Sequence, residues 1–132
     1  MDTSTRQTIA TDGAPKAIGP YSQGLISGDL LFASGQIPLD PATGELVPEG
    51  IERGVERVFD SIEAILKAAG CTLDDVVKTT VYLARMADFA AMNGVYARRF
   101  GSHRPARSTV AVAELPKCAA VEIDVFARVP GK

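Results

Sequence analysis

An arginine and a glutamate stand inside two apolar runs near the end of the chain. Arg107 lies in the small and branched run RSTVAV, and Glu122 is flanked by Val121 and Ile123. An unpaired guanidinium away from water costs several kcal/mol, so Arg107 needs an anionic partner. That partner is either Glu122, in a structural salt bridge, or the carboxylate of a ligand, which a planar guanidinium binds through two parallel hydrogen bonds. In the second case Glu122 is free to handle a proton or a water molecule.

The other reactive residue types narrow the chemistry further. His103 is the only histidine, so a site with two histidine ligands is excluded and a Ser-His-Asp triad is disfavoured. Cys71 and Cys118 lie far apart without a CxxC pair, which argues against a disulfide framework and a structural zinc site. The chain also lacks the GxxxxGK[ST] and GxGxxG nucleotide motifs. We therefore expect no metal and no cofactor, with any catalysis resting on carboxylates, arginine, tyrosine, hydroxyls and backbone groups.

The composition is typical of a globular protein. The chain has 132 residues, of which 46% are hydrophobic and 23% charged, and this length fits one domain with its own core. We expect a single domain over residues 1–132, with residues 1–6 flexible. The formal charge of -2 disfavours nucleic acid as a partner, because phosphate binding needs a basic surface. No apolar run resembles a signal peptide or a membrane span, so we expect a cytoplasmic protein without a membrane partner.

Two segments are predicted to form helices. Apolar side chains recur at helical spacing over residues 51–69, and Gly70 supplies the C-terminal stop. A second helix is predicted over residues 89–100, with Asp88 as its N-cap. Asn93 lies on the apolar row of this second helix and is expected to point inward.

Short runs of β-branched or alternating residues predict the strands. Their ranges are the two halves of 24–34 around the Gly28-Asp29 turn, then 75–84, 106–112 and 120–129, with a further short strand near Ile9. The resulting order predicts an α+β domain with two helices on one face of a six-stranded mixed sheet. The second sheet face then has to meet water or another chain. Because the strands offer little polar surface, we expect a homo-oligomer, with a solvated antiparallel face as the alternative.

The most specific signal is a set of six blocks spread over about residues 7 to 129. They are GPYSQG (19–24), ASGQIP (33–38), AAGCTLDDVVKTTVYL (68–83), DFAAMNGVY (88–96), RPARSTV (104–110) and LPKCAAVEID (115–124). In order and spacing these blocks resemble the RidA (YjgF-type) family of enamine and imine deaminases. The resemblance implies chorismate-mutase-like subunits, a homotrimer whose sheets form a central barrel, and clefts at the subunit interfaces.

The same resemblance implies a reaction and its residues. The reaction is hydrolysis of 2-aminoacrylate-type enamines or imines, released by pyridoxal-phosphate enzymes, to 2-oxo acids and ammonia. The implied ligand is thus a small carboxylated imine or a 2-oxo acid. Arg107 matches the arginine that binds the substrate carboxylate, and Glu122 matches the acid that positions or activates water. The positions that match the rest of the cleft are Tyr21, Ser34, Gly35, Asn93 and Thr109.

Each of these cleft residues has a purely structural alternative. Tyr21 would cap the core, Asn93 would be an ordinary polar group of its helix, and Ser34 with Gly35 would form a turn at the end of a strand. Thr109 stands where many members of the family have cysteine; it keeps the backbone contacts and removes thiol-based regulation. The alternative function is a non-enzymatic trimer that uses the cleft to bind a metabolite or acts as a chaperone. RNA cleavage is disfavoured by the lone histidine and the acidic balance.

Overall fold

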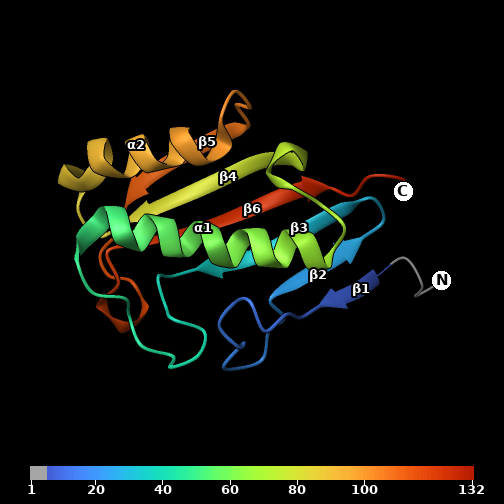
Figure 1. Ribbon diagram of the computed structural model, residues 1–132, viewed down its shortest axis with the longest axis horizontal. Coiled ribbons are helices and arrows are strands. Elements are labelled where there is room, and N and C mark those ends of the chain that lie inside the picture. The colour runs from blue at the N-terminus through green and yellow to red at the C-terminus, as the bar shows by residue number, and fades with distance from the viewer. Residues whose placement is uncertain (1–5) are drawn as a thin grey trace.

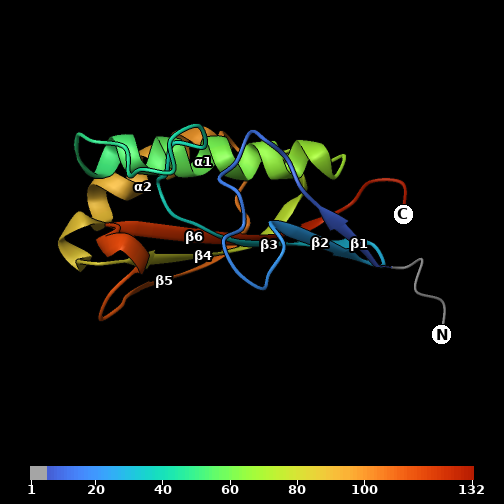
Figure 2. The same ribbon diagram turned by 90° about the horizontal axis from the view of Figure 1, so that it is seen from below.

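The computed structural model describes residues 6–132, so the segment predicted to be flexible lies outside the described residues except for Arg6. Six strands form one sheet in the order β1-β2-β3-β6-β4-β5. Two helices, α1 (Gly50–Ala68) and α2 (Phe89–Phe100), pack on the sheet (Figure 1). Figure 2 shows that both helices cover the same face and leave the other face bare. The predicted α+β class and the two helices on one face are confirmed.

The strands lie where the alternation of residues predicts them. Their bounds are β1 (Arg6–Ile9), β2 (Gly24–Ser27), β3 (Leu30–Gln36), β4 (Val76–Leu83), β5 (Ala106–Ala111) and β6 (Val121–Arg128). Neighbouring strands pair antiparallel, with one exception. Strands β4 and β5 pair parallel, and α2 connects them along the chain. The sheet is therefore mixed, as expected. One-turn helices add Leu73–Asp75, Met86–Asp88 and Pro116–Cys118.

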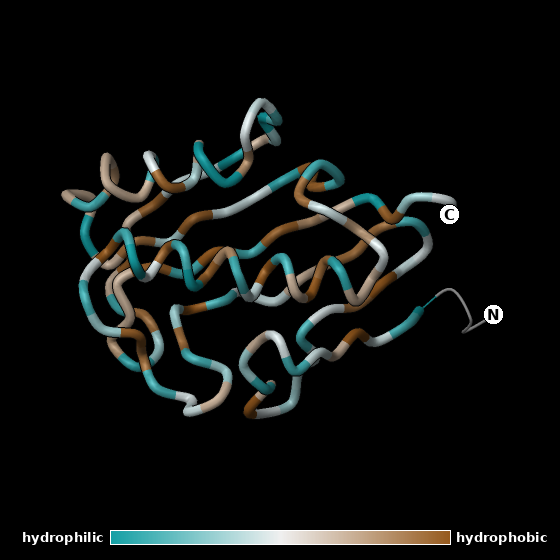
Figure 3. The backbone as a smooth tube through the Cα atoms, in the orientation of Figure 1, coloured by the Kyte–Doolittle hydropathy of each residue, from teal (hydrophilic) through white to brown (hydrophobic). Residues whose placement is uncertain are grey.

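Helix α1 forms because its apolar residues return to one side at every turn. Val55, Phe59 and Ile62 are completely buried against the sheet, and each such side chain stabilises the fold by roughly 1.5–3 kcal/mol. Figure 3 shows the resulting alternation of hydrophobic and hydrophilic residues along α1. Gly70 ends the helical run with φ +81, a conformation that only glycine adopts without strain.

Helix α2 begins at the predicted residue, but Asp88 does not cap it. The side chain of Asp88 makes no hydrogen bond to the helix N-terminus. Its carboxylate instead lies 3.6 Å from the guanidinium of Arg85. The one-turn helix Met86–Asp88 runs directly into α2 and holds Asp88 at φ -85, ψ 2, whereas an N-cap residue needs an extended backbone.

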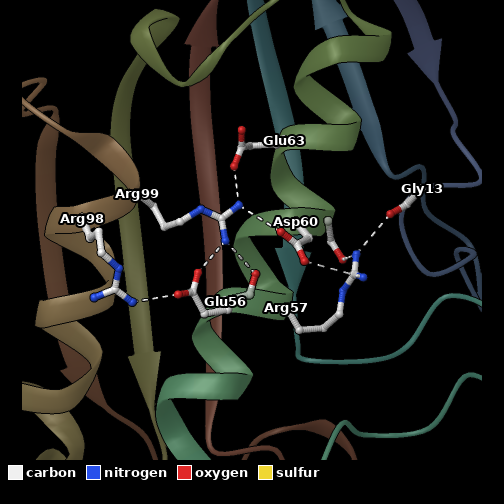
Figure 4. Close-up of polar contacts among 8 residues, drawn as sticks. Gly13, Glu56, Arg57, Asp60, Glu63, Arg98 and Arg99 are labelled. Carbon is white, nitrogen blue, oxygen red and sulfur yellow. Dashed lines mark hydrogen bonds and ion pairs between the residues drawn. The ribbon is translucent and has the colours of Figure 1, made fainter.

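A cluster of charged residues joins α2 to α1 (Figure 4). The guanidinium of Arg99 donates to Glu56 at 2.7 Å, to Asp60 at 3.0 Å and to Glu63. Arg98 donates to the other carboxylate oxygen of Glu56 at 2.7 Å. These bonds from Arg99 and Arg98 hold the pKa of Glu56 below its ordinary value. A shared network of this kind fixes one helix on the other more firmly than an isolated surface pair.

Candidate active site

Glu122 lies on the bare face of the sheet, where β6 places it opposite Tyr82 of β4. Its carboxyl group packs directly on the backbone of Gly35, since a Cβ at that glycine would stand 2.2 Å from Oε2. Gly35 occupies the point at which the pairing of β3 with β6 shifts, between Ala33 and Gln36. The irregular strand and the missing side chain together create the space for the carboxyl group.

A cavity of about 270 Å³ opens over Glu122, with Tyr21 and Gly35 in its wall. Tyr21 is 53% exposed, so it does not cap the core. Ser34 does not line the cavity, and its hydroxyl donates to the carbonyl of Ser22 at 2.6 Å. Ser34 therefore anchors the segment that carries Tyr21. Because Ser34 and Gly35 lie inside β3, they do not form a turn that ends the strand.

The surroundings of Glu122 favour its protonated form. Burial and, second, the negative charge of Asp124 raise the pKa of Glu122 above its ordinary value. Asp124 lies two residues further along β6 on the same face and accepts a hydrogen bond from the Tyr82 hydroxyl at 3.1 Å. A raised pKa makes the ionised carboxylate a stronger proton acceptor, which suits a group that takes up and returns protons.

Replacing Asp124 by asparagine is expected to lower the pKa of Glu122, because the change removes a negative charge that opposes ionisation. The burial contribution remains, so the shift is only part of the way to the ordinary value. Titration of the Glu122 carboxyl carbon by NMR measures this directly. Asp74→Asn is the matched control, since it removes the same charge from an exposed residue of the one-turn helix Leu73–Asp75. An unchanged or higher pKa in the Asp124→Asn protein would contradict the expectation.

Arg107 lies on the opposite face of the sheet, under α2. Strand β5 places it beside Thr79, which is completely buried. Nη1 of Arg107 donates to Oδ1 of Asn93 at 2.7 Å. Its Cζ lies 4.6 Å from the ring centroid of Tyr96 and 5.5 Å from that of Phe89. Phe89, Asn93 and Tyr96 are spaced four and three residues apart, so one face of α2 holds the guanidinium.

The first of the two alternatives for Arg107, a salt bridge with Glu122, does not form within the chain, because the sheet separates the two side chains. Arg107 pairs with no carboxylate among residues 6–132. Asn93 occupies only Nη1, which leaves the Nε and Nη2 edge free to bind a carboxylate through two hydrogen bonds. Arg107 and Asn93 also line a second cavity, of about 410 Å³. Asn93 thus points inward as expected and has a specific polar partner.

Thr109 shares the helix-covered face with Arg107 and lies opposite Val81 of β4. Its hydroxyl oxygen is buried and has no hydrogen-bond partner among residues 6–132. Such an unpaired group costs the fold about 1–3 kcal/mol.

The seven predicted site residues therefore form two groups on one chain. The first group, around the cavity on the bare face, is Tyr21, Ser34, Gly35 and Glu122; the second, under α2, is Asn93, Arg107 and Thr109. The structure brings together the members within each group and keeps the two groups apart.

Gln23 is a residue of the first cavity that sequence reasoning did not single out. Its Oε1 accepts from the backbone of Thr11 at 2.6 Å, and its Nε2 donates to the carbonyls of Pro15 at 2.8 Å and Ala14 at 3.3 Å. The buried amide therefore fixes the segment that forms the cavity rim. Its place inside the block GPYSQG was the available signal. Sequence reasoning also did not indicate the contact of Arg107 with the Tyr96 ring, although Tyr96 lies three residues after Asn93 on the same side of α2.

Two further observations concern the part of the chain that the structure describes. Across residues 6–132, no three His, Cys, Asp or Glu side chains gather closely enough to hold a metal ion, and no helix has the length and apolar character needed to cross a membrane.

The ring of His103 bonds to the carbonyl of Val76 at 2.7 Å and packs edge-on against Phe100. This histidine lines neither of the two cavities.

Comparison with known proteins adds independent evidence. Residues 11–129 match the family model described as Endoribonuclease L-PSP. A RutC family protein of Pyrococcus horikoshii is 52% identical over 92% of this chain and 97% of its own length. The 2-iminobutanoate/2-iminopropanoate deaminase of Escherichia coli is 46% identical over 92% of this chain and 96% of its own. The crystal structure of E. coli TdcF with bound serine superposes with a TM-score of 0.88 at 42% identity, covering 92% and 98% of the two chains.

Proposed function

Because the chain belongs to the RidA (YjgF-type) family, which the Endoribonuclease L-PSP model describes, we propose that it hydrolyses 2-aminoacrylate-type enamines and imines to 2-oxo acids and ammonia. The observation that carries this proposal is the free edge of Arg107, a guanidinium fixed by Asn93 and Tyr96 without any carboxylate partner among residues 6–132. A small carboxylated substrate supplies the missing anion. The deaminase name of the E. coli relative and the serine bound by TdcF support a substrate of this size and charge.

The proposed reaction uses Arg107 for binding and Glu122 for proton transfer. The substrate carboxylate binds the Nε and Nη2 edge of Arg107, which orients the imine carbon. Glu122 accepts a proton from water while the water oxygen bonds to that carbon. The protonated Glu122 gives this proton to the nitrogen, which completes a neutral carbinolamine. Glu122 then takes the proton of the carbinolamine hydroxyl and passes it to the amine nitrogen. The carbon-nitrogen bond breaks as the carbon-oxygen double bond forms, and the 2-oxo acid and ammonia leave. General base help of this kind contributes about 10²- to 10⁴-fold to the rate.

We propose that a second copy of the chain completes the site. One chain holds Arg107 and Glu122 on opposite faces of its sheet, so a small substrate cannot touch both. The bare face exposes Phe32 (38%), Phe126 (40%) and Val110 (43%), and apolar side chains of this size favour burial against another subunit. In the trimer that we propose, the Arg107 group of one subunit faces the Glu122 group of its neighbour.

The direct test couples the purified protein to a pyridoxal-phosphate dehydratase acting on serine or threonine. We expect faster appearance of the 2-oxo acid, and we expect Arg107→Ala to remove this effect because the substrate loses its charge partner and its orientation. Arg107→Lys keeps the charge without the planar fork and should recover little. Arg53→Ala, at an exposed arginine of α1, is the control for a lost positive charge. Full activity in Arg107→Ala would overturn the carboxylate-binding role.

The competing function is a metabolite-binding module that uses the same groups without chemistry. In that case Glu122→Gln would leave both the affinity for a 2-oxo acid and the biological effect unchanged. In the enzyme, Glu122→Gln retains binding and loses turnover, since the amide cannot accept the proton of water. Calorimetric titration with pyruvate, run beside the coupled assay, distinguishes the two functions.

A further inference from the structure

The cavity beside Arg107 contains a second guanidinium. Arg104 and Arg107 both line the space of about 410 Å³, together with Asn93 and Tyr96 of α2. No Asp or Glu is part of this lining among the described residues. Two positive charges therefore face one small cavity without a protein anion between them.

Arg104 is held in place by two main-chain carbonyl groups. Its Nη1 donates to the carbonyl of Gly101 and to that of His103, the latter at 2.9 Å. Carbonyl dipoles orient a guanidinium but leave its full positive charge. Arg104 pairs with no carboxylate of residues 6–132. Its Nε and Nη2 therefore remain available to an anion, as those of Arg107 do.

The two arginines of α2 itself show the opposite arrangement. Arg98 pairs with Glu56, and Arg99 pairs with Glu56, Asp60 and Glu63. Carboxylates of α1 thus neutralise the two arginines that join the helices. The two arginines that line the cavity, Arg104 and Arg107, have no such carboxylate among residues 6–132. Since like charges in one cavity repel, the ligand that fits this arrangement best carries two negative charges.

We propose that Arg104 binds a second carboxylate of the substrate, so that the protein accepts imines of dicarboxylic amino acids such as 2-iminosuccinate. This inference rests on the proposed function: Arg107 takes the carboxylate next to the imine carbon, and Arg104 takes the distal one. The chemical step is unchanged, because water still adds to the imine carbon and ammonia leaves. Arg104 acts in specificity and makes no contact with the reacting atoms.

The test compares 2-iminosuccinate with 2-iminopropanoate, each generated from its amino acid by an amino-acid oxidase in the presence of catalase. Arg104→Gln is expected to lower kcat/KM for 2-iminosuccinate about tenfold, mainly through KM, since a charge-assisted hydrogen bond is lost. Hydrolysis of 2-iminopropanoate should stay within about twofold of wild type, because one carboxylate needs only Arg107. Arg104→Lys should recover part of the loss. Arg98→Gln, which removes an equal charge from the Glu56 side of α2, should affect neither substrate.

Four outcomes would overturn the inference. They are equal losses with both imines in Arg104→Gln, no loss with either, dissociation of the oligomer in that variant, and a wild-type protein that hydrolyses 2-iminopropanoate but not 2-iminosuccinate. The last result would leave the proposed function intact. Hydrolysis of neither imine would contradict the proposed function itself. Titration of wild type and Arg104→Gln with oxaloacetate and with pyruvate would then decide the role of Arg104 by binding alone, with a loss confined to oxaloacetate in its favour.

Discussion

Mixing two inactive variants, Arg107→Ala and Glu122→Gln, is expected to restore about a quarter of the wild-type imine hydrolysis once their subunits have exchanged. Each single variant lacks one half of every site. In a mixed oligomer, some sites receive Arg107 from one subunit and Glu122 from its neighbour, both intact. With equal amounts and random assembly, half of the subunits carry each intact residue, so about one site in four is complete.

The experiment has a matched second mixture that separates a shared site from a site within one chain. Wild type mixed with the double variant Arg107→Ala/Glu122→Gln should also keep about a quarter of full activity if neighbours share the site. If one chain held the whole site, this second mixture would keep about half and the first would stay inactive. Native mass spectrometry of the mixtures establishes that subunits exchanged. Inactivity of the first mixture after exchange would contradict the shared site.

Replacing Gly35 by alanine is expected to lower imine hydrolysis about 10²- to 10⁴-fold, the loss expected for a displaced general base. The new Cβ would stand 2.2 Å from Oε2 and 2.8 Å from Cδ of Glu122, distances that real side chains do not tolerate. Because the obstructing atoms are the end of a flexible side chain, Glu122 moves and the fold persists. We therefore expect a modest change in Tm with a large fall in kcat.

Gly94→Ala is the control for adding a methyl group. An added Cβ at Gly94 in α2 meets nothing within 4 Å, and alanine in a helix is favoured over glycine by about 1 kcal/mol. This variant should keep full activity with equal or higher Tm. A folded Gly35→Ala protein with wild-type kcat would show that Glu122 does not act from its place against the Gly35 backbone.

Local structure followed from local sequence at most positions. The helical repeat of Val55, Phe59 and Ile62 predicted α1, and these side chains are completely buried. The Gly28-Asp29 pair predicted the hairpin between β2 and β3, in which Gly28 takes φ +65. These features depend on backbone preferences and on periodicity within a few residues, so a single segment contains the information. The exception, Asp88, arose because a preceding helical turn changed its backbone.

The identities of the candidate site residues were likewise available from the sequence, through the six blocks and through the placement of Asn93 on the inner row of α2. The contacts of these residues were not. The hydrogen bond from Arg107 to Asn93 joins residues fourteen positions apart, and the packing of Glu122 on Gly35 joins β6 to β3. Each depends on how separate elements are placed beside one another.

The separation of Arg107 from Glu122 is the clearest case of a property that only the tertiary structure decided. Alternation along a strand tells which neighbours share a face with a given residue, but it does not tell which face the helices will cover. Strand β4 lies between β5 and β6 and pairs Arg107 with Thr79 on the covered face and Glu122 with Tyr82 on the bare face. The sequence therefore determined which residues are present for chemistry, and the pairing register determined that one chain holds them on opposite sides of its sheet.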